Sequence, residues 1–206
     1  MLRRGKTAME IITQDGWLEV ITGCMFSGKT EELVRRLRRA VIAKKETIAI
    51  KPALDTRYDL VAVVSHSGFS FNAIPVEDPK SILGMAKDAE VVGIDEAQFF
   101  TGELVPVIRE LLQNKKRVIV AGLDLDFRGE PFGIMPTLLA LADEVTKLHA
   151  ICSVCGNIAT KTQRLINGRP ARYDDPTILV GGLETYEARC NLHHEVPGKT
   201  LTLFKE

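Results

Sequence analysis

Residues 23–30 read Gly23-Cys24-Met25-Phe26-Ser27-Gly28-Lys29-Thr30, which is the pattern G-x-x-x-x-G-K-T. An apolar run, 17–22, precedes this stretch, and a run with helical spacing follows it. In that context the pattern predicts a phosphate-binding loop between a strand and a helix. Backbone N–H groups of such a loop surround phosphate oxygens, and the helix N-terminus adds partial positive charge. We expect Lys29 to reach the β- and γ-phosphates and the Thr30 hydroxyl to bind Mg²⁺.

The composition indicates one well-buried core with a small addition. The chain has 206 residues, 45% of them hydrophobic, and its 27 basic residues balance its 27 acidic ones. That balance argues against nucleic acid or a membrane surface as a partner held by bulk charge. No apolar run approaches the roughly 20 residues that cross a bilayer. Residues 1–15 lack the apolar core of a signal peptide and predict a flexible extension, so we expect a cytoplasmic protein.

Apolar runs alternate with helical runs as far as residue 150. The expected strands cover 20–22, 47–50, 69–76, 91–94, 117–121 and 144–150, and the expected helices cover 30–45, 77–89, 103–114 and 136–142. Strands with little alternation, separated by helices, predict an α/β fold of the phosphate-loop NTPase type: a mostly parallel sheet with helices on both faces. After residue 150, cysteines, glycines and polar turns replace this rhythm. We therefore expect an α/β domain over 16–150 and a second, metal-binding domain over 151–206.

The helix expected at 30–45 carries a dense set of basic residues. An apolar stripe on this helix is formed by Leu33, Val34, Leu37, Ala40 and Val41. The basic residues predict a solvated face, with a subunit contact as the alternative. They are Arg35, Arg36, Arg38, Arg39, Lys44 and Lys45.

Two carboxylates follow the apolar run at 91–94. Asp95 and Glu96 come directly after it, and the carboxyl ends of parallel strands form the ligand-binding edge of such a sheet. Asp95 fits a water-mediated role at Mg²⁺, and Glu96 fits a general base. The alternative is a solvent-exposed strand end, where acidic residues are common.

Four further side chains have the spacing of a metal site. Cys152 and Cys155 form one C-x-x-C pair, and Cys190 and His193 form a C-x-x-H pair. Two such pairs suit tetrahedral, structural Zn²⁺, because each presents two donors on one side of the metal. His194 is an alternative to His193, although the spacing favours His193. Disulfides are the competing interpretation, which the cytoplasmic context disfavours.

Several aromatic and arginine side chains have two interpretations. Phe99 and Phe127 follow expected strands near the ligand-binding edge, where they would either stack on a nucleobase or belong to the core. Phe100 is expected in the core. Arg57 and Arg164 are either phosphate ligands or ordinary surface arginines.

Taken together, these stretches resemble the type II thymidine kinases, the cytosolic, zinc-containing deoxynucleoside kinases. The resemblance runs from about residue 16 to about residue 196. It is carried by residues 22–30, 55–58, 65–66, 94–100, 121–124 and 127–133, and by the two metal-ligand pairs.

The resemblance implies ATP-dependent phosphorylation of the thymidine 5′-hydroxyl, a step of nucleotide salvage for DNA synthesis. It places Glu96 as base, Lys29 and Arg57 in catalysis, and Asp95 and Thr30 on the Mg²⁺ side. Gln98 joins the phosphate-binding residues. The implied thymidine contacts are Met25, Phe99, Leu123, Phe127, Phe132, Thr162, Val180, Gly181 and Tyr186.

The resemblance also implies how the protein assembles and is regulated. A "lasso" loop around 180–182 is tethered by the zinc and reads the pyrimidine edge through its backbone. Members of the family are usually homotetramers, and the end product dTTP inhibits them.

A different class of protein remains as the alternative. A phosphate-loop ATPase or GTPase could act as a switch or motor, with the zinc module binding a partner. The stretch Asn114-Lys115-Lys116-Arg117 lacks the aspartate of a guanine reader, and a motor would usually need a larger chain.

Overall fold

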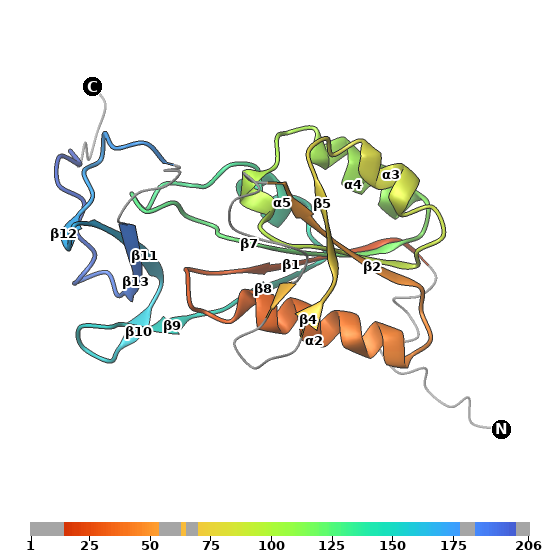
Figure 1. Cartoon of the computed structure of the whole chain (residues 1–206), viewed down its shortest axis with the longest axis horizontal. Coiled ribbons are helices and arrows are strands. Elements are labelled where there is room, and N and C mark those ends of the chain that lie inside the picture. Colours follow the sequence, from red (N-terminus) through yellow and green to blue (C-terminus); the bar gives the residue numbers. More distant parts are fainter. Residues whose placement is uncertain (1–14, 54–62, 65–69, 178–183, 201–206) are drawn as a thin grey trace. The chain divides into compact units, whose positions relative to one another are not determined.

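The computed structural model describes residues 15–53, 63–64, 70–177 and 184–200. The chain divides into two compact units, which are described separately (Figure 1). The first unit comprises Met1–Thr22, Lys29–Gly122 and Gly133–Lys147. The second comprises Gly23–Gly28, Leu123–Phe132 and Leu148–Glu206. The domain boundary expected near residue 151 stays a prediction.

A six-stranded sheet forms the centre of the first unit, in the order β5-β2-β6-β7-β1-β8. All its pairings are parallel, which confirms the predicted α/β class. A separate antiparallel pair joins β3 to β4. The strands of this unit are β1 (Trp17–Thr22), β2 (Thr47–Pro52), β3 (Val63–Val64), β4 (Ser70–Phe71), β5 (Ala73–Val76), β6 (Val91–Ile94), β7 (Arg117–Gly122) and β8 (Glu144–Lys147).

Helices cover both faces of this sheet (Figure 1). Helix α2 (Lys29–Ile42) lies on one face, while α3 (Ser81–Met85), α4 (Leu104–Gln113) and α5 (Met135–Leu141) lie on the other. A short 3₁₀ helix, η1 (Ala97–Phe99), follows β6. The main core lies on the face of the three shorter helices and contains Leu18, Val20, Ile94, Val120 and Leu138 among others. Phe100 belongs to it, as expected.

A glycine sets how closely α2 packs on the sheet. A Cβ at Gly93 of β6 would lie 2.7 Å from Cδ1 of Leu37 on α2. A larger residue at this position would force the Leu37 side chain to move from its place on the strand. The missing side chain therefore helps to seat the helix that follows the phosphate loop.

Four predicted elements differ from the structure. Helix α2 ends at Ile42, and Lys44 takes a left-handed φ of 60°. The helix expected at 77–89 is reduced to α3. The strand expected at 144–150 divides, because residues 150–151 form β9, which pairs antiparallel with β10 and not with β1. The strand expected at 69–76 is two short strands, β4 and β5, and residue 69 lies outside the described residues.

The second unit is built from short antiparallel strands. One sheet pairs β9 (Ala150–Ile151) with β10 (Ile158–Ala159), and a second has the order β12-β11-β13. The strands of the second sheet are β11 (Lys161–Ile166), β12 (Arg169–Pro170) and β13 (Glu184–Arg189). Around the metal-ligand pairs, one buried apolar cluster of this unit comprises Cys24, Ala150, Cys152, Ala159, Ala188 and Cys190. Small side chains of this kind bury little area, so a metal bound at this cluster would add stability to it.

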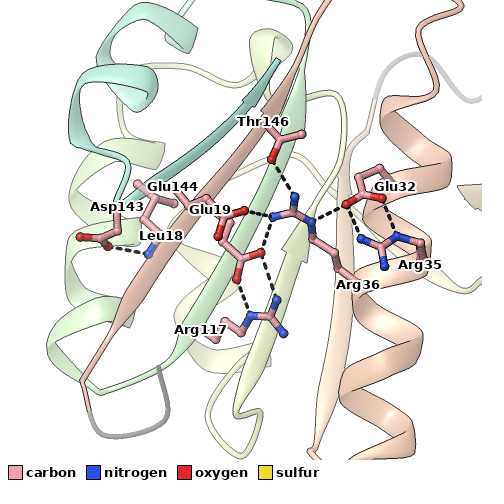
Figure 2. A network of polar contacts seen from close by, with 9 residues as sticks. All are labelled: Leu18, Glu19, Glu32, Arg35, Arg36, Arg117, Asp143, Glu144 and Thr146. Carbon is pink, nitrogen blue, oxygen red and sulfur yellow. Dashed lines mark hydrogen bonds and ion pairs between the residues drawn. The ribbon is translucent and has the colours of Figure 1, made fainter. Parts of the chain in front are cut away.

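A charged network lies between β1 and α2 in the first unit (Figure 2). Glu19 is 1% exposed although it carries a charge. Its carboxylate accepts hydrogen bonds from Arg36 Nη1 and from Arg117 Nε, each at 2.5 Å. Arg36 also contacts Glu32 at 2.8 Å and Glu144 at 3.1 Å. The prediction of a solvated basic face is therefore wrong for Arg36, which is 8% exposed.

We expect Glu19→Gln to lower the free energy of unfolding by about 3–5 kcal/mol, because removing one partner leaves buried arginine charge without its main counter-charge. Urea unfolding followed by circular dichroism measures this change. Glu90→Gln is the matched control, since Glu90 pairs with Lys45 at 2.6 Å on the surface. That change should cost less than about 1 kcal/mol. Equal losses in the two variants would contradict a structural role for the buried network.

Candidate functional site

The loop of residues 23–28 joins the end of β1 to the start of α2, as the sequence predicted. Three of its residues have left-handed backbone: Gly23 at φ 140°, Phe26 at 64° and Gly28 at 86°. Left-handed residues between right-handed ones turn successive N–H groups toward one centre, which suits an anion. A Cβ at Gly23 would lie 2.2 Å from the carbonyl oxygen of Leu148, so only glycine fits there.

Two hydrogen bonds tie this loop to other segments of the second unit. The Met25 N–H donates to Thr162 Oγ1 at 3.0 Å, and Cys24 Sγ donates to the Ala159 carbonyl at 3.4 Å. The Ser27 hydroxyl oxygen is buried and has no hydrogen-bond partner among the described residues. A phosphate oxygen would satisfy it, since buried polar groups are normally paired. The loop geometry therefore fits the predicted phosphate-binding role.

The acidic pair lies at the end of β6 in the first unit. Asp95 is 6% exposed, so the alternative of a solvent-exposed strand end does not hold for it. Its Oδ2 accepts a hydrogen bond from Thr30 Oγ1 at 3.1 Å, and its Oδ1 accepts one from the Glu96 N–H at 2.9 Å. Burial, together with the negative charge of Glu96, raises the pKa of Asp95 to about 7. A cation would offset both effects, so the contact between Asp95 and Thr30 fits the predicted Mg²⁺ side.

Glu96 has a strained backbone. Its φ is 51° and its ψ is 39°, a left-handed conformation that costs a non-glycine residue about 1–3 kcal/mol. Gln98 Nε2 donates a hydrogen bond to the Glu96 carboxylate, and Gln98 is 3% exposed. A carboxylate held this way has a defined direction, which suits a general base. The predicted role of Gln98 in phosphate binding stays a prediction.

Predicted nucleoside contacts gather in the second unit. Phe127, Leu123 and Thr162 are buried there, and Met25, Phe132 and Tyr186 are half-buried. Asp124 O accepts from the Phe132 N–H at 3.0 Å, which closes the loop 123–132. Phe99, half-buried in η1, belongs to the first unit. Arg57, Val180 and Gly181 lie outside the described residues.

Arg164 differs from its prediction. Its side chain is fully buried, so the interpretation as a surface arginine is wrong. Its guanidinium carbon lies 4.1 Å from the ring centroid of Phe127, within cation–π range. Its Nη1 donates to the carbonyl oxygen of Pro176 at 2.6 Å. Arg164 therefore fixes the ring of Phe127 from one side.

Cys152, Cys155, Cys190 and His193 converge as predicted, with donor atoms all within 4.8 Å of one another. Two sulfurs, of Cys155 and Cys190, are 3.8 Å apart, and His193 Nδ1 lies 3.2 Å from Cys190 Sγ and 3.8 Å from Cys152 Sγ. In a tetrahedral zinc site, bonds are about 2.3 Å to sulfur and about 2.0 Å to nitrogen. These bond lengths place two sulfur ligands ~3.8 Å apart and a sulfur and a nitrogen ligand ~3.5 Å apart. The cluster therefore fits zinc.

The chemistry of the donors supports the same conclusion. Burial opposes ionisation of Cys152, but hydrogen bonds from the backbone of Cys190, Val154 and Cys155 lower its pKa to about 6, which favours the thiolate that binds metal. None of the four cysteines, all of which lie in the described residues, forms a disulfide. His193 and not His194 belongs to the cluster.

We expect the purified protein to contain about one zinc per chain, and Cys155→Ser to lose most of it, because a tetrahedral site needs all four donors. Elemental analysis after purification without chelator measures this content. The matched control is Cys24→Ser, which should keep its zinc because Cys24 is no member of the cluster. Equal zinc in the Cys155→Ser variant and the parent would contradict the assignment.

Sequence reasoning missed two contacts of this unit. His194 Nε2 lies 2.8 Å from the Phe127 carbonyl oxygen, and Gln163 bonds the backbone of Glu195. Burial lowers the pKa of His194, although its bond to Phe127 opposes the change. The sequence marks His194 only as an alternative metal ligand, and nothing in it indicates the contact with Phe127 or the contacts of Gln163.

Two comparisons relate this chain to known proteins. The family model described as thymidine kinase matches residues 16–194. Among solved structures, the chain is similar to the flagellar accessory protein FlaH from Methanocaldococcus jannaschii, with 12% identity and a TM-score of 0.48 over 76% of this chain and 82% of that chain. In the described part of the chain, no helix is both long and apolar enough to cross a membrane.

Proposed function

The chain belongs to the thymidine kinase family, and from this premise we propose that it transfers the γ-phosphate of ATP to the 5′-hydroxyl of thymidine, giving dTMP. Membership makes it a phosphotransferase acting on nucleosides and nucleotides. The observation that supports the finer proposal most is the span of the match. Residues 16–194 include the phosphate loop, the acidic pair and both metal-ligand pairs. The dTMP would enter DNA synthesis through nucleotide salvage.

Each residue of the proposed reaction has a physical task. Glu96 accepts the proton of the 5′-hydroxyl while that oxygen forms its bond to the γ-phosphorus and the bond to ADP breaks. Lys29 supplies positive charge to the phosphates, and the loop N–H groups bind their oxygens. Asp95 and Thr30 would hold Mg²⁺, which when bound neutralises phosphate charge. Arg57 is assigned to the same charge stabilisation.

Thymidine recognition is proposed to depend mainly on apolar contact and backbone polarity. Phe127, fixed by Arg164 at 4.1 Å, offers a rigid face for a base. The backbone at Val180 and Gly181 is assigned to the O2, N3 and O4 edge of thymine. The remaining proposed contacts are Met25, Phe99, Leu123, Phe132, Thr162 and Tyr186. We also propose a homotetramer and dTTP as a feedback ligand.

A nucleoside panel tests this proposal. With ATP and Mg²⁺, thymidine should be the best substrate, and deoxyuridine should be several-fold weaker because it lacks one methyl group, worth about 1 kcal/mol. Deoxycytidine reverses two hydrogen-bond polarities at about 1–3 kcal/mol each, so its kcat/KM should fall by orders of magnitude.

A reaction without nucleoside is the control for this panel. A kinase should consume little ATP there, whereas a switch or motor would hydrolyse ATP at its full rate. Rapid hydrolysis without nucleoside would overturn the proposal. Equal efficiency for deoxycytidine and thymidine would overturn only the edge-reading part of it.

A further inference from the structure

The residue after the last metal ligand holds the backbone of a predicted nucleoside contact. His193 Nδ1 lies in the metal cluster, 3.2 Å from Cys190 Sγ. The next side chain, His194, places its Nε2 2.8 Å from the carbonyl oxygen of Phe127. Because a carbonyl oxygen only accepts, this ring nitrogen must be the donor. Adjacent histidines thus connect the metal cluster to the loop 123–132.

The backbone of the following residue, Glu195, is bonded to strand β11 through Gln163. Gln163 is 1% exposed, and its side chain exchanges two hydrogen bonds with the backbone of Glu195. Its Nε2 donates to the Glu195 carbonyl at 2.9 Å, and its Oε1 accepts from the Glu195 N–H at 2.8 Å. On either side of Gln163, Thr162 accepts from the Met25 N–H at 3.0 Å and Arg164 stacks on the Phe127 ring. The segment 193–195 therefore contacts two of the elements that carry proposed thymidine residues, the loop 123–132 with Phe127 and strand β11 with Thr162.

We infer that His194 and Gln163 are positioning residues, through which the metal site fixes Phe127 and strand β11 for nucleoside binding. Metal bound by His193 would hold the segment 193–195 in place. Within that segment, His194 contacts the Phe127 backbone, and the Glu195 backbone contacts Gln163 of β11. This role rests on the proposed function, because it takes Phe127, Thr162 and Met25 as nucleoside contacts. The metal ligands have no proposed part in phosphoryl transfer. Through these two positioning residues, the metal would nevertheless affect nucleoside binding, and more strongly than it affects turnover.

Four zinc-loaded variants test this inference beside the parent, and Gln163→Met is one of them. His194→Phe keeps a ring of similar size but removes the donor. His194→Gln restores an N–H donor near the same position. Leu192→Ala is the matched control, because Leu192 lies between the ligands Cys190 and His193, close to His194 in the chain, and is 87% exposed. Zinc content, the KM values for thymidine and ATP, kcat, and backbone hydrogen exchange of the loop 123–132 are measured for each.

We expect about one zinc per chain throughout. His194→Phe should raise the thymidine KM about tenfold, as the loss of one buried hydrogen bond predicts, with kcat and the ATP KM within about twofold. Exchange in the loop 123–132 should be faster in this variant, near parental in His194→Gln, and unchanged in Leu192→Ala. Gln163→Met should speed exchange in β11 and raise the same KM, which keeps the test decisive if His194→Phe folds poorly.

Other results would overturn the inference. Parental exchange and KM in both His194→Phe and Gln163→Met would remove the positioning role. Loss of zinc in His194→Phe would make His194 a ligand, and a fall in kcat at constant KM would move its effect to the chemical step. Exchange is measured without nucleoside, so it distinguishes the two failures. If the parent does not phosphorylate thymidine, the proposed function fails while exchange still decides the contacts.

Discussion

Glu96→Gln should lower kcat for thymidine by about 10²–10⁴-fold while the thymidine KM changes little. The amide has the size of the carboxylate but cannot accept the 5′-hydroxyl proton. The left-handed backbone of Glu96 and the hydrogen bond from Gln98 remain available to the variant, so the side chain should keep its place. Steady-state kinetics with saturating ATP, together with thymidine binding by calorimetry, separates lost chemistry from lost binding.

Glu103→Gln is the control for this measurement. Glu103 is an acidic residue of the same unit that pairs with Lys80 at 2.8 Å, and its side chain is 53% exposed. Its replacement should leave kcat near the parental value, because exposed ion pairs contribute little. A Glu96→Gln variant that turns over as fast as the control would exclude Glu96 as the base.

The parts of the site that could be predicted depend on local sequence. The phosphate loop needs glycines at fixed positions between a strand and a helix, and the left-handed φ of Gly23 and Gly28 is the reason. Asp95 could be placed because an apolar run ends directly before it. The metal ligands could be predicted because each pair lies within one turn of chain.

Two arginines show what local pattern did not reveal. Arg36 was grouped with a basic face, yet it lies three residues after Leu33 and four before Ala40, on the buried side of α2. This spacing indicates that Arg36 faces the core. The acidic Glu19 within the apolar run of β1 indicates a buried partner for it. Arg164 had no such signal, because its burial depends on Phe127 and Pro176.

Contacts between distant segments explain the remaining omissions. Residues 23–28 and 123–132 group with residues from 148 onward, although long stretches of chain separate them. Pairings such as Met25 with Thr162, or His194 with Phe127, carry no periodic pattern in the sequence. Only the three-dimensional arrangement of the second unit reveals them.

Lys29→Ala is expected to lower kcat/KM for thymidine by about 10²–10³-fold, the loss typical of removing one group that stabilises transition-state charge. Lys29 is the first residue of α2 and is 8% exposed, so its ammonium group is poorly solvated and acts strongly on nearby charge. It also opposes the rise in the pKa of Asp95. Without it that pKa should rise further, leaving Asp95 less ionised at neutral pH and a weaker partner for Mg²⁺.

The variant should therefore lose activity in two ways, and raising the pH should recover only the part that depends on Asp95. A pH series of kcat/KM from 6 to 9, around the pKa of about 7 for Asp95, measures that part. Lys45→Ala is the control: it removes a lysine that follows α2 and pairs with Glu90 at 2.6 Å. Circular dichroism must show both variants folded. A folded Lys29→Ala protein that phosphorylates thymidine at the control's rate would contradict the assignment of residues 23–30 to phosphate binding. Lys29 is the one charged residue of this motif, so no other side chain within it could stabilise phosphate charge in its place.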